Sequence, residues 1–337
     1  MRDGSVLILS GKEVGEICAG RELEILEAVR AAYRAHGRGE SALPHSTFLR
    51  FPDDESNRII ALPAYLGDAF AVAGVKWIAS FPGNVDRGMA RASALLVLNS
   101  TSNGRPEVVL EGSLVSALRT AASAAAAAHA LLGGGSPQVA GLVGAGVIQR
   151  QTAHFLALAL PGLRRFLVHD LDAARARRLA DALEQRGARA EVAPALGEVL
   201  ARCSLVSFAT TALRPHVHDL SRCPAGAVIL HVSLRDLAPQ LLLHADNVVD
   251  DPDHVCRAET SVHLAERLAG NRDFIRCTLA DILDGRAPAR RDATSLAVFS
   301  PFGLGVLDLA VGQLVARHAQ AAGRGVVLPD FIPEPED

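Results

Sequence analysis

The chain has 337 residues, more than the roughly 250 to 300 at which a single hydrophobic core stops growing, so two domains are expected. Apolar residues make up 49% of it and charged residues 21%, which supports a large core and excludes bulk disorder. The net charge of -3, with one Trp and two Tyr for base stacking, gives no reason to expect nucleic acid. A small-molecule ligand is the expected partner.

The sequence has no evident motif for export, membrane insertion or metal binding. The N-terminal apolar run is too short for a signal peptide, and no later run approaches the roughly 20 residues of a membrane span, so a cytoplasmic protein is expected. The five cysteines show no CxxC pair, which favours buried free thiols. His216 and His218 lack HExxH or clustered Cys/His partners, so no bound metal is expected.

The first third of the chain predicts a mainly antiparallel sheet. Residues 5–9 read as a strand, Ser10 as the cap of a first helix, and residues 22–36 as an amphipathic helix. Turn signals such as Phe81-Pro-Gly-Asn84 separate further expected strands at 58–63, 71–80, 92–99 and 107–111. This succession is a meander, whose neighbouring strands are antiparallel.

From Gly112 the pattern changes to an alanine-rich helix, with Ser113 as its expected cap. Strands and helices then alternate at βαβ spacing, which predicts a parallel, doubly wound sheet. Residues 251–285 read as helical, and a last helix at 306–320 precedes the tail 328–337, expected to be a solvated end. The alternating elements are strands 138–143, 166–169, 189–192, 204–208, 227–231 and 247–249, with helices 147–159, 172–186 and 194–202.

Gly144 and Gly146 lie after an apolar strand and at the start of a helix. The glycines let the backbone turn tightly and approach a pyrophosphate, whose charge would meet the amides of the helix start at Val147 and Ile148. The third glycine of GxGxxG is replaced by Gln149, so a tight turn without a ligand is the alternative. The context of strand and helix favours a dinucleotide site.

Asp170 ends the second strand of this region, near the distance from Gly144 expected for the acidic residue that accepts ribose hydroxyls. An acid there disfavours the 2′-phosphate of NADP, and no Arg follows it directly, although Arg175 lies about a turn later. NAD is therefore the expected cofactor. Thr210 and Ser233 end the fourth and fifth strands on hydroxyl side chains, where the ligands of such sheets gather.

Lys76 stands in the apolar segment AVAGVKWIASFPGN, and Lys12 is the only other lysine of the chain. A protonated lysine in an apolar strand is costly unless paired, so burial should lower its pKa toward the range useful for proton transfer. Arginine stays charged and cannot serve as acid and base in turn. The alternative is a lysine that reaches solvent from the strand end.

Arginines cluster around the predicted strands. Arg91 precedes an apolar strand and Arg119 lies between apolar residues of the long helix, and both positions suit bidentate binding of a carboxylate. Arg50, Arg58 and others belong to the same cluster, in which several arginines are expected to be ordinary surface charges.

Six segments in order resemble the ornithine cyclodeaminase and mu-crystallin family over nearly the whole chain: VKWIASFPGN, ARASALLVLN, EGSLVSALRTAASAAAAAHAL, GLVGAGVIQ, HADNVVDD and SPFGLGVLDLA. The resemblance implies an α/β protein with a Rossmann-type doubly wound parallel sheet and an α+β domain with a mainly antiparallel sheet. The expected domains are a substrate-binding and dimerisation domain of residues 1–125 with 305–337, and an NAD-binding domain of residues 126–304. A homodimer with a cleft between the domains is implied.

The resemblance also implies roles for individual residues. The family's motif lysine and RTAA arginine frame the substrate beside the nicotinamide, which gives Lys76 and Arg119 catalytic roles and Arg119 and Thr120 cofactor contacts. Ornithine cyclodeaminases carry a catalytic Asp in a loop after the fifth strand. Here that loop reads HVSLRD, with no Asp at the corresponding place unless the loop shifts to offer Asp236.

Together with the segments KWIASFPGN and RASALLVLN, that loop resembles most the branch of the family that makes 2,3-diaminopropionate for siderophore and peptide-antibiotic biosynthesis. The expected reaction is NAD-dependent oxidative cleavage of N-(2-amino-2-carboxyethyl)-L-glutamate to 2-oxoglutarate and L-2,3-diaminopropionate, with the motif lysine moving protons. The three carboxylates of this substrate suit a pocket of Arg91, Arg119 and Arg58 or Arg50, and Ser233 is an expected contact of both substrate and cofactor.

Two other interpretations stay open. One is a different enzyme of the same family: an ornithine cyclodeaminase, an alanine dehydrogenase or a cyclic ketimine reductase, from which the Ser233 loop distinguishes the chain. The other is a non-catalytic NAD(H)-binding protein, because a fold does not fix a function. Retention of Lys76 in an arginine-dominated chain speaks against the second interpretation.

Overall fold

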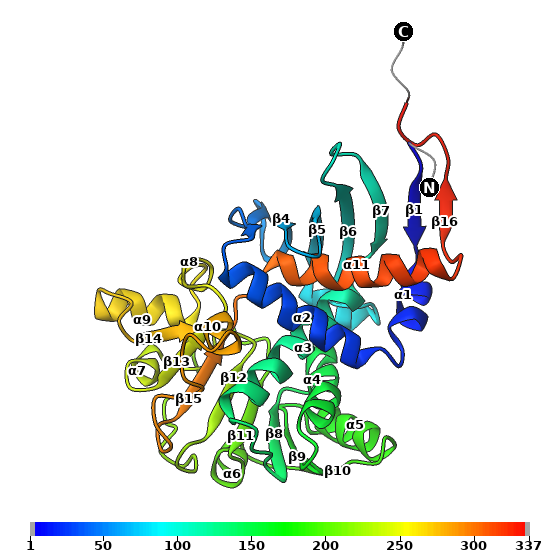
Figure 1. The fold of residues 1–337 in the computed structure, drawn as a ribbon. Coiled ribbons are helices and arrows are strands. Elements are labelled where there is room, and N and C mark those ends of the chain that lie inside the picture. The colour runs from blue at the N-terminus through cyan, green and yellow to red at the C-terminus, as the bar shows by residue number, and fades with distance from the viewer. Residues whose placement is uncertain (1–3, 334–337) are drawn as a thin grey trace. The chain divides into compact units, whose positions relative to one another are not determined.

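The structure is a computed structural model that describes residues 4–333, except the side chain of Glu55, and it divides the chain into two compact units (Figure 1). The first unit comprises Met1–Arg119 and Leu304–Asp337, and the second Thr120–Gly303. The first junction falls within the helix α3 (Gly112–Leu131). Of the expected solvated tail, residues 334–337 lie outside the described residues.

The first unit is built on an eight-stranded sheet. Its strands are β1 (Val6–Leu9), β2 (Ser41–Ala42), β3 (Thr47–Phe51), β4 (Asp54–Leu66), β5 (Val72–Ser80), β6 (Ala92–Ser100), β7 (Pro106–Glu111) and β16 (Val326–Leu328). Its other helical elements are α1 (Gly11–Cys18), α2 (Glu22–Gly37), the 3-10 turn η1 (Pro82–Arg87) and α11 (Gly305–Ala321). The strand order is β16-β1-β7-β6-β5-β4-β2 with β3 paired to β4, and of the neighbouring pairs only β1 and β7 are parallel.

The two faces of this sheet differ in burial. On one face Leu96 and Leu98 are buried under α11, which packs across β4, β5 and β6 with α2 beside it (Figure 1). The alternate positions point to the other face, because side chains of a strand change face at every residue. There Tyr65, Trp77 and Leu95 are 41%, 44% and 43% exposed. This second face is therefore apolar and accessible in the single chain.

The second unit is a parallel eight-stranded sheet in the order β10-β9-β8-β11-β12-β15-β13-β14, so the predicted doubly wound α/β fold is confirmed. Its strands are β8 (Val139–Val143), β9 (Arg165–His169), β10 (Arg189–Val192), β11 (Leu205–Phe208), β12 (Val228–His231), β13 (Asp246–Val249), β14 (Ile275–Thr278) and β15 (Ala297–Ser300). Its helices are α4 (Val147–Ala159), α5 (Ala173–Glu184), α6 (Leu196–Arg202), α7 (Pro239–Leu242), α8 (Pro252–Val255), α9 (Ser261–Ala269) and α10 (Leu279–Leu283).

Some local predictions are corrected. The segment 251–285, expected to be helical, contains the strand β14 between short helices. Ser113 does not cap α3, because the carboxylate of Glu111 accepts the backbone N–H of Ser113 at 2.7 Å and of Leu114 at 3.0 Å. The cap at Ser10 is confirmed, since its side chain accepts the backbone N–H of Glu13.

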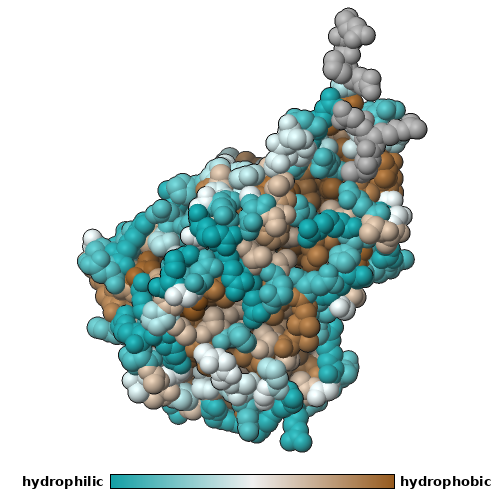
Figure 2. Space-filling view, viewed as in Figure 1, coloured by the Kyte–Doolittle hydropathy of each residue, from teal (hydrophilic) through white to brown (hydrophobic). Residues whose placement is uncertain are grey.

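The end of the chain and the alanine-rich helix bear on two further predictions. Leu328, the first residue of the expected solvated tail, ends the edge strand β16, and residues 329–333 that follow it are mostly exposed, as expected. Hydrophobic residues gather near this strand in Figure 2, and Val326 is 57% and Val327 50% exposed. The helix α3 is long and apolar enough to cross a membrane by length and composition, although no such stretch was expected. It is mostly buried within the protein, as the alanines 121, 122 and 124–128 show.

Candidate active site

Lys76 is buried in the centre of the first unit's sheet. It lies on β5 opposite Leu62 of β4 and Leu96 of β6, and only 2% of its surface is exposed. A lysine that reaches solvent is therefore excluded. An ammonium group at this depth needs a counter-charge, because desolvation disfavours the charged form.

Asp308 of α11 supplies that counter-charge. Lys76 Nζ donates to Asp308 Oδ2 at 2.6 Å and to Ser116 Oγ at 3.2 Å. Arg119 Nε donates to Asp308 Oδ1 at 3.2 Å, and its Nη2 donates to Ser116 Oγ at 3.3 Å. Asp308 has no exposed surface, so one buried carboxylate holds two cations together. We call Lys76, Ser116, Arg119 and Asp308 the lysine cluster.

Two glycines let α11 approach the sheet closely enough to place Asp308 beside Lys76. A Cβ at Gly74 would lie 2.9 Å from Leu309 Cδ2, and a Cβ at Gly312 would lie 2.4 Å from Leu96 Cδ2. Asp308 also lies in the first turn of α11, where the helix dipole favours a negative charge. The two glycines and the start of the helix thus place the acid beside Lys76.

The surroundings of Lys76 tune its acidity. Burial and the positive charge of Arg119 lower the pKa of Lys76 to about 8, while the charge and hydrogen bond of Asp308 raise it and limit the shift. A group with this pKa takes up and releases a proton near neutral pH, which an arginine cannot do. The lysine cluster can therefore exchange protons with a bound molecule.

A second set, Arg50, Arg58 and Arg91, lies at one end of the same strands. Arg58 is the cross-strand partner of Arg50 on β3 and of Ser80 on β5. Burial lowers the pKa of Arg58 and so does the charge of Arg50, while burial and the charge of Arg58 lower the pKa of Arg91. Arg91 Nε is buried without a hydrogen-bond partner, and none of the three forms an ion pair with a described side chain. A bound anion would relieve the repulsion between these guanidinium groups. We call the three the arginine group.

The sheet register places Arg58 on the same face as Lys76. Leu62 lies opposite Lys76, and Arg58 lies four residues before Leu62 on β4. Side chains an even number of residues apart share a face, and four residues of strand span about 13 Å. One face of one sheet therefore offers a proton-exchanging group and, about 13 Å along the strand, a cationic group.

In the second unit, Gly144 forms the tight turn expected of a dinucleotide site. Its φ is +90°, its N–H donates to His169 O at 2.8 Å, and a Cβ there would lie 2.5 Å from Ala209 O. Only glycine fits this conformation and this space. The turn lies between the ends of β8 and β11, the switch point at which ligands of doubly wound sheets bind.

The helix α4 begins directly after this turn. Gly146 is its N-cap with open space around it, and Val147 and Ile148 belong to the first turn, whose N–H groups lack intrahelical partners. Gln149, at the position of the missing third glycine, is fully buried. Its Nε2 donates to Ser207 O at 2.8 Å, and its Oε1 accepts from Ser207 Oγ at 3.0 Å. These bonds join helix to strand in place of the close contact that glycine allows.

Asp170 lies beside the glycine turn at the end of β9. Its carboxylate accepts the N–H of Ala145 at 2.7 Å and the N–H of Asp172 at 2.9 Å. Arg175 lies 3.5 Å from the carboxylate of Asp172, and both side chains are about half exposed. The acid thus stands where the adenosine ribose of a dinucleotide is expected.

The remaining predicted site residues are distributed along the second unit. Thr120 follows Arg119 in α3 and is half-buried. Thr210 and Ser233 follow β11 and β12, and each donates its hydroxyl to the buried carboxylate of Asp236. The structure therefore brings Thr210 and Ser233 together at Asp236. From the sequence, Asp236 was considered only as a possible replacement for the missing catalytic Asp.

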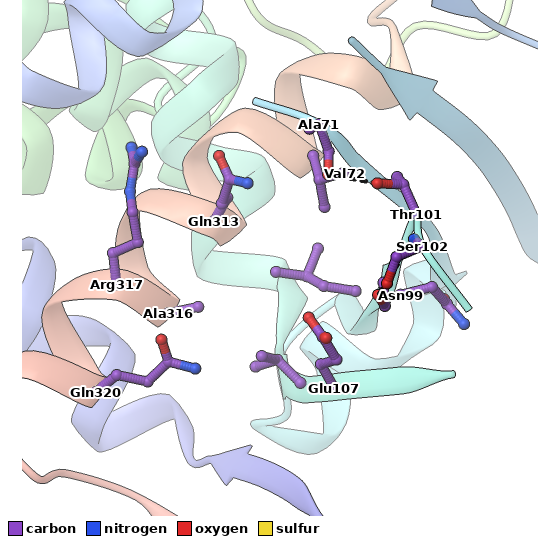
Figure 3. A pocket seen from close by; sticks show the side chains of 13 residues that line it. Ala71, Val72, Asn99, Thr101, Ser102, Glu107, Gln313, Ala316, Arg317 and Gln320 are labelled. Carbon is purple, nitrogen blue, oxygen red and sulfur yellow. Dashed lines mark hydrogen bonds between the residues drawn. The ribbon is translucent and has the colours of Figure 1, made fainter. Parts of the chain in front are cut away.

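The cavity drawn in Figure 3 lies apart from these groups. It holds about 240 Å³ between α11 and the ends of β5, β6 and β7. Gln313 and Arg317 of α11 stand across it from Asn99 and Glu107, and Thr101 Oγ1 donates to Ala71 O at 3.2 Å. None of its lining residues belongs to the lysine cluster or the arginine group, so we do not assign it to the active site. Among residues 4–333, no group of His, Cys, Asp or Glu could hold a metal ion.

Sequence reasoning missed two members of the lysine cluster, Ser116 and its acid, Asp308. A signal was available, because Asp308 stands between Leu307 and Leu309 in the otherwise apolar run 301–312. A buried acid in such a helix requires a cation, which is the same argument that singles out Lys76. The two residues are 232 positions apart, so only the folded chain identifies them as partners.

Comparisons with known proteins agree with this architecture. The profile described as Ornithine cyclodeaminase/mu-crystallin family matches residues 6–323. N-((2S)-2-amino-2-carboxyethyl)-L-glutamate dehydrogenase of Staphylococcus aureus is 25% identical, covering 96% of this chain and 98% of its own. Alanine dehydrogenase of Archaeoglobus fulgidus is 28% identical with the same coverage. An archaeal alanine dehydrogenase, solved as a dimer with bound NAD, is 26% identical with a TM-score of 0.85, over 97% of this chain and 100% of that one.

A doubly wound sheet with a glycine turn at its switch point is typical of dinucleotide-dependent oxidoreductases, and the relatives place this chain among them. Relatives that match almost end to end are dehydrogenases. The chain belongs to the ornithine cyclodeaminase/mu-crystallin family, whose profile spans nearly all of it.

Proposed function

We propose that the chain uses NAD to oxidise the secondary amine N-(2-amino-2-carboxyethyl)-L-glutamate, giving 2-oxoglutarate and L-2,3-diaminopropionate. The observation that carries the proposal is the placement of Lys76 and Arg58 on one face of one sheet. A substrate with three carboxylates uses both a proton-exchanging group and a separate cationic group. The Staphylococcus aureus relative bears the name of a dehydrogenase of this amine.

NAD, when bound, supplies the acceptor for the hydride of the glutamyl Cα. Neutral Lys76 takes the proton of the amine nitrogen as the carbon–nitrogen double bond forms. Lys76 then exchanges protons with the water that adds to the imine carbon. The water oxygen becomes the keto oxygen of 2-oxoglutarate, and the nitrogen leaves on 2,3-diaminopropionate.

Arg119 is the proposed anchor of a substrate carboxylate next to Lys76. Asp308 and Ser116 hold its Nε and Nη2, and its Nη1 has no hydrogen bond to a described residue. The guanidinium is thus oriented and keeps a donor for the ligand. Arg91 and Arg58, with Arg50, hold the distal carboxylates in this proposal.

A substrate panel tests the reaction. The purified chain is incubated with NAD and the diaminopropionate–glutamate amine, and in parallel with ornithine, lysine, proline and alanine, while NADH formation is followed by absorbance. The proposal predicts the highest kcat/KM for the first amine. A preference for ornithine or alanine would identify another activity of the family, and binding of NADH without turnover of any amine would indicate a non-catalytic protein.

The arginine group should set the substrate preference. Arg58→Gln is expected to raise the KM for the three-carboxylate amine by about tenfold or more, because a charge-assisted hydrogen bond contributes about 1.5 to 3 kcal/mol. Any residual turnover of alanine, which has no distal carboxylate, should be unaffected. Arg30→Gln, which removes a surface pairing with Glu27, is the control and should leave both substrates unchanged. Equal losses for both substrates would argue against a distal-carboxylate role.

Asp170 should select NAD over NADP. Its carboxylate accepts ribose hydroxyls and repels a 2′-phosphate, so the wild type is expected to bind NAD more tightly than NADP. Asp170→Ala should bring the Kd values of the two cofactors closer together. Titration of both cofactors into both proteins measures this. Tighter binding of NADP than NAD by the wild type would contradict the assignment.

The apolar sheet face of the first unit supports a homodimer. Tyr65, Trp77 and Leu95 are each more than 40% exposed there, and exposed apolar surface of this kind is typical of an interface. Light scattering is expected to give twice the mass of one chain, and the mass of a monomer at assay concentration would contradict it. The proposed place of the reaction is the cytoplasm, in the biosynthesis of a siderophore or peptide product.

A further inference from the structure

Asp236 is the centre of a polar network at the carboxyl ends of β11 and β12. Thr210 donates its hydroxyl to Oδ1, and Ser233 donates its hydroxyl to Oδ2. His216 Nε2 lies 3.1 Å from Oδ1. The residue has no exposed surface, so its carboxylate is enclosed by groups that belong to the two strand ends.

The backbone of Asp236 is also held by hydrogen bonds. Its backbone N–H donates to His231 Nε2 at 3.1 Å, and His231 Nδ1 lies 3.2 Å from Ser300 Oγ at the end of β15. Its carbonyl oxygen accepts the N–H groups of His216 and Val217, both at 2.9 Å. Asp236 therefore ties the loop after β11 to the core through main chain and side chain together.

The charge state of Asp236 follows from these contacts. Burial alone would raise the pKa of its carboxyl, but the neighbouring His231 imidazole and the hydroxyls of Ser233 and Thr210 lower the pKa further, to below its usual range. The carboxylate is thus ionised at neutral pH and its oxygens are occupied by donors. It is poorly suited to take a proton from a substrate and well suited to hold hydroxyl groups in one orientation.

We infer that Asp236 is a positioning residue, which orients Thr210, Ser233 and His216 for the ribose–nicotinamide half of the cofactor. A hydroxyl whose hydrogen points to Asp236 offers only lone pairs to a ligand, so Thr210 and Ser233 act as acceptors. The matching donors are the ribose hydroxyls and the carboxamide NH₂ of a nicotinamide nucleotide. The imidazole of His216, whose side chain is 43% exposed, is held by Nε2, and its Nδ1 has no hydrogen-bond partner among the described residues.

This inference rests on the proposed use of NAD, and NADH binding tests it without turnover. Titration of NADH, followed by fluorescence, is expected to give a Kd about three- to tenfold higher for Asp236→Asn than for the wild type, because the amide accepts only one of the two hydroxyls. Ser233→Ala should weaken binding in the wild type but much less in the Asp236→Asn background. Additive effects of the two changes would overturn the positioning role.

A matched control separates positioning from stability. Asp246 is another fully buried acid of the same unit and pairs with Arg276 at 2.5 Å, so Asp246→Asn should lower the melting temperature without changing the Kd for NADH. If Asp236→Asn lowers the melting temperature and leaves the Kd unchanged, the inference is wrong. Weaker NADH binding in the variant, with a wild type that oxidises no amine, would support the inference and contradict only the proposed reaction.

Discussion

Lys76→Met is expected to lower kcat by about 10²- to 10⁴-fold, the range typical of a positioned general acid or base, while NADH binding stays close to that of the wild type. NADH binding should be retained because Lys76 lies in the first unit, whereas the glycine turn expected to bind the cofactor lies in the second. The thioether has a similar length and removes only the exchangeable proton and the charge. Steady-state kinetics and NADH titration on one preparation measure both quantities.

Lys76→Arg is the matched control for charge. Arginine keeps the pairing with Asp308 but stays protonated at any assay pH, so this variant should be nearly as inactive as Lys76→Met. Near-normal turnover of Lys76→Arg would show that only the positive charge is needed and would remove proton transfer from the account.

Asp308→Asn is expected to have the second largest effect, on stability and on pH dependence. It leaves the buried ammonium of Lys76 and the guanidinium of Arg119 without their carboxylate, and breaking a buried pair in this way typically costs about 3 to 5 kcal/mol. A Lys76→Met/Asp308→Asn double variant should regain part of that loss, because one unpaired charge is gone. Denaturant unfolding of the three proteins measures the difference, and an unchanged stability of Asp308→Asn would contradict the pairing.

The pH profile of amine oxidation reports the same pair. Lys76 must be neutral to accept a proton, so kcat/KM should rise with pH through the Lys76 pKa of about 8 and level off above it. Asp308 raises that pKa, so the rising limb should move to lower pH in Asp308→Asn. A limb that stays in place would show that another group titrates.

Local sequence patterns were sufficient to predict most of the fold. The βαβ spacing from residue 138 predicted the parallel sheet because each buried strand and each helix carries its own periodicity. The strands β14 and β15 were not predicted, although they have the same length as β10 to β13, which were. The strand β14 lies between the helices α9 and α10, and the whole segment reads as helical. The edge strand β16 depends on pairing with β1, more than 300 residues away, and no local signal encodes that.

The residues of the candidate site also divide into those that local sequence reveals and those whose roles depend on distant partners. Gly144, Asp170 and Lys76 could be found because each is unusual for its own segment. The role of Asp308 depends on a partner from the other end of the chain, and that of Asp236 on hydroxyl groups from two separate strand ends. Long-range pairing is a property of the folded chain, so the partners of these two acids emerge only from the structure.

The stoichiometry of the reaction tests the central claim most directly. Wild-type protein with NAD and N-(2-amino-2-carboxyethyl)-L-glutamate is predicted to release NADH, 2-oxoglutarate and L-2,3-diaminopropionate in equal amounts, quantified by absorbance and mass spectrometry. Absence of 2-oxoglutarate and of NADH with this amine, in a preparation that binds NADH and oxidises ornithine, proline or alanine, would contradict it.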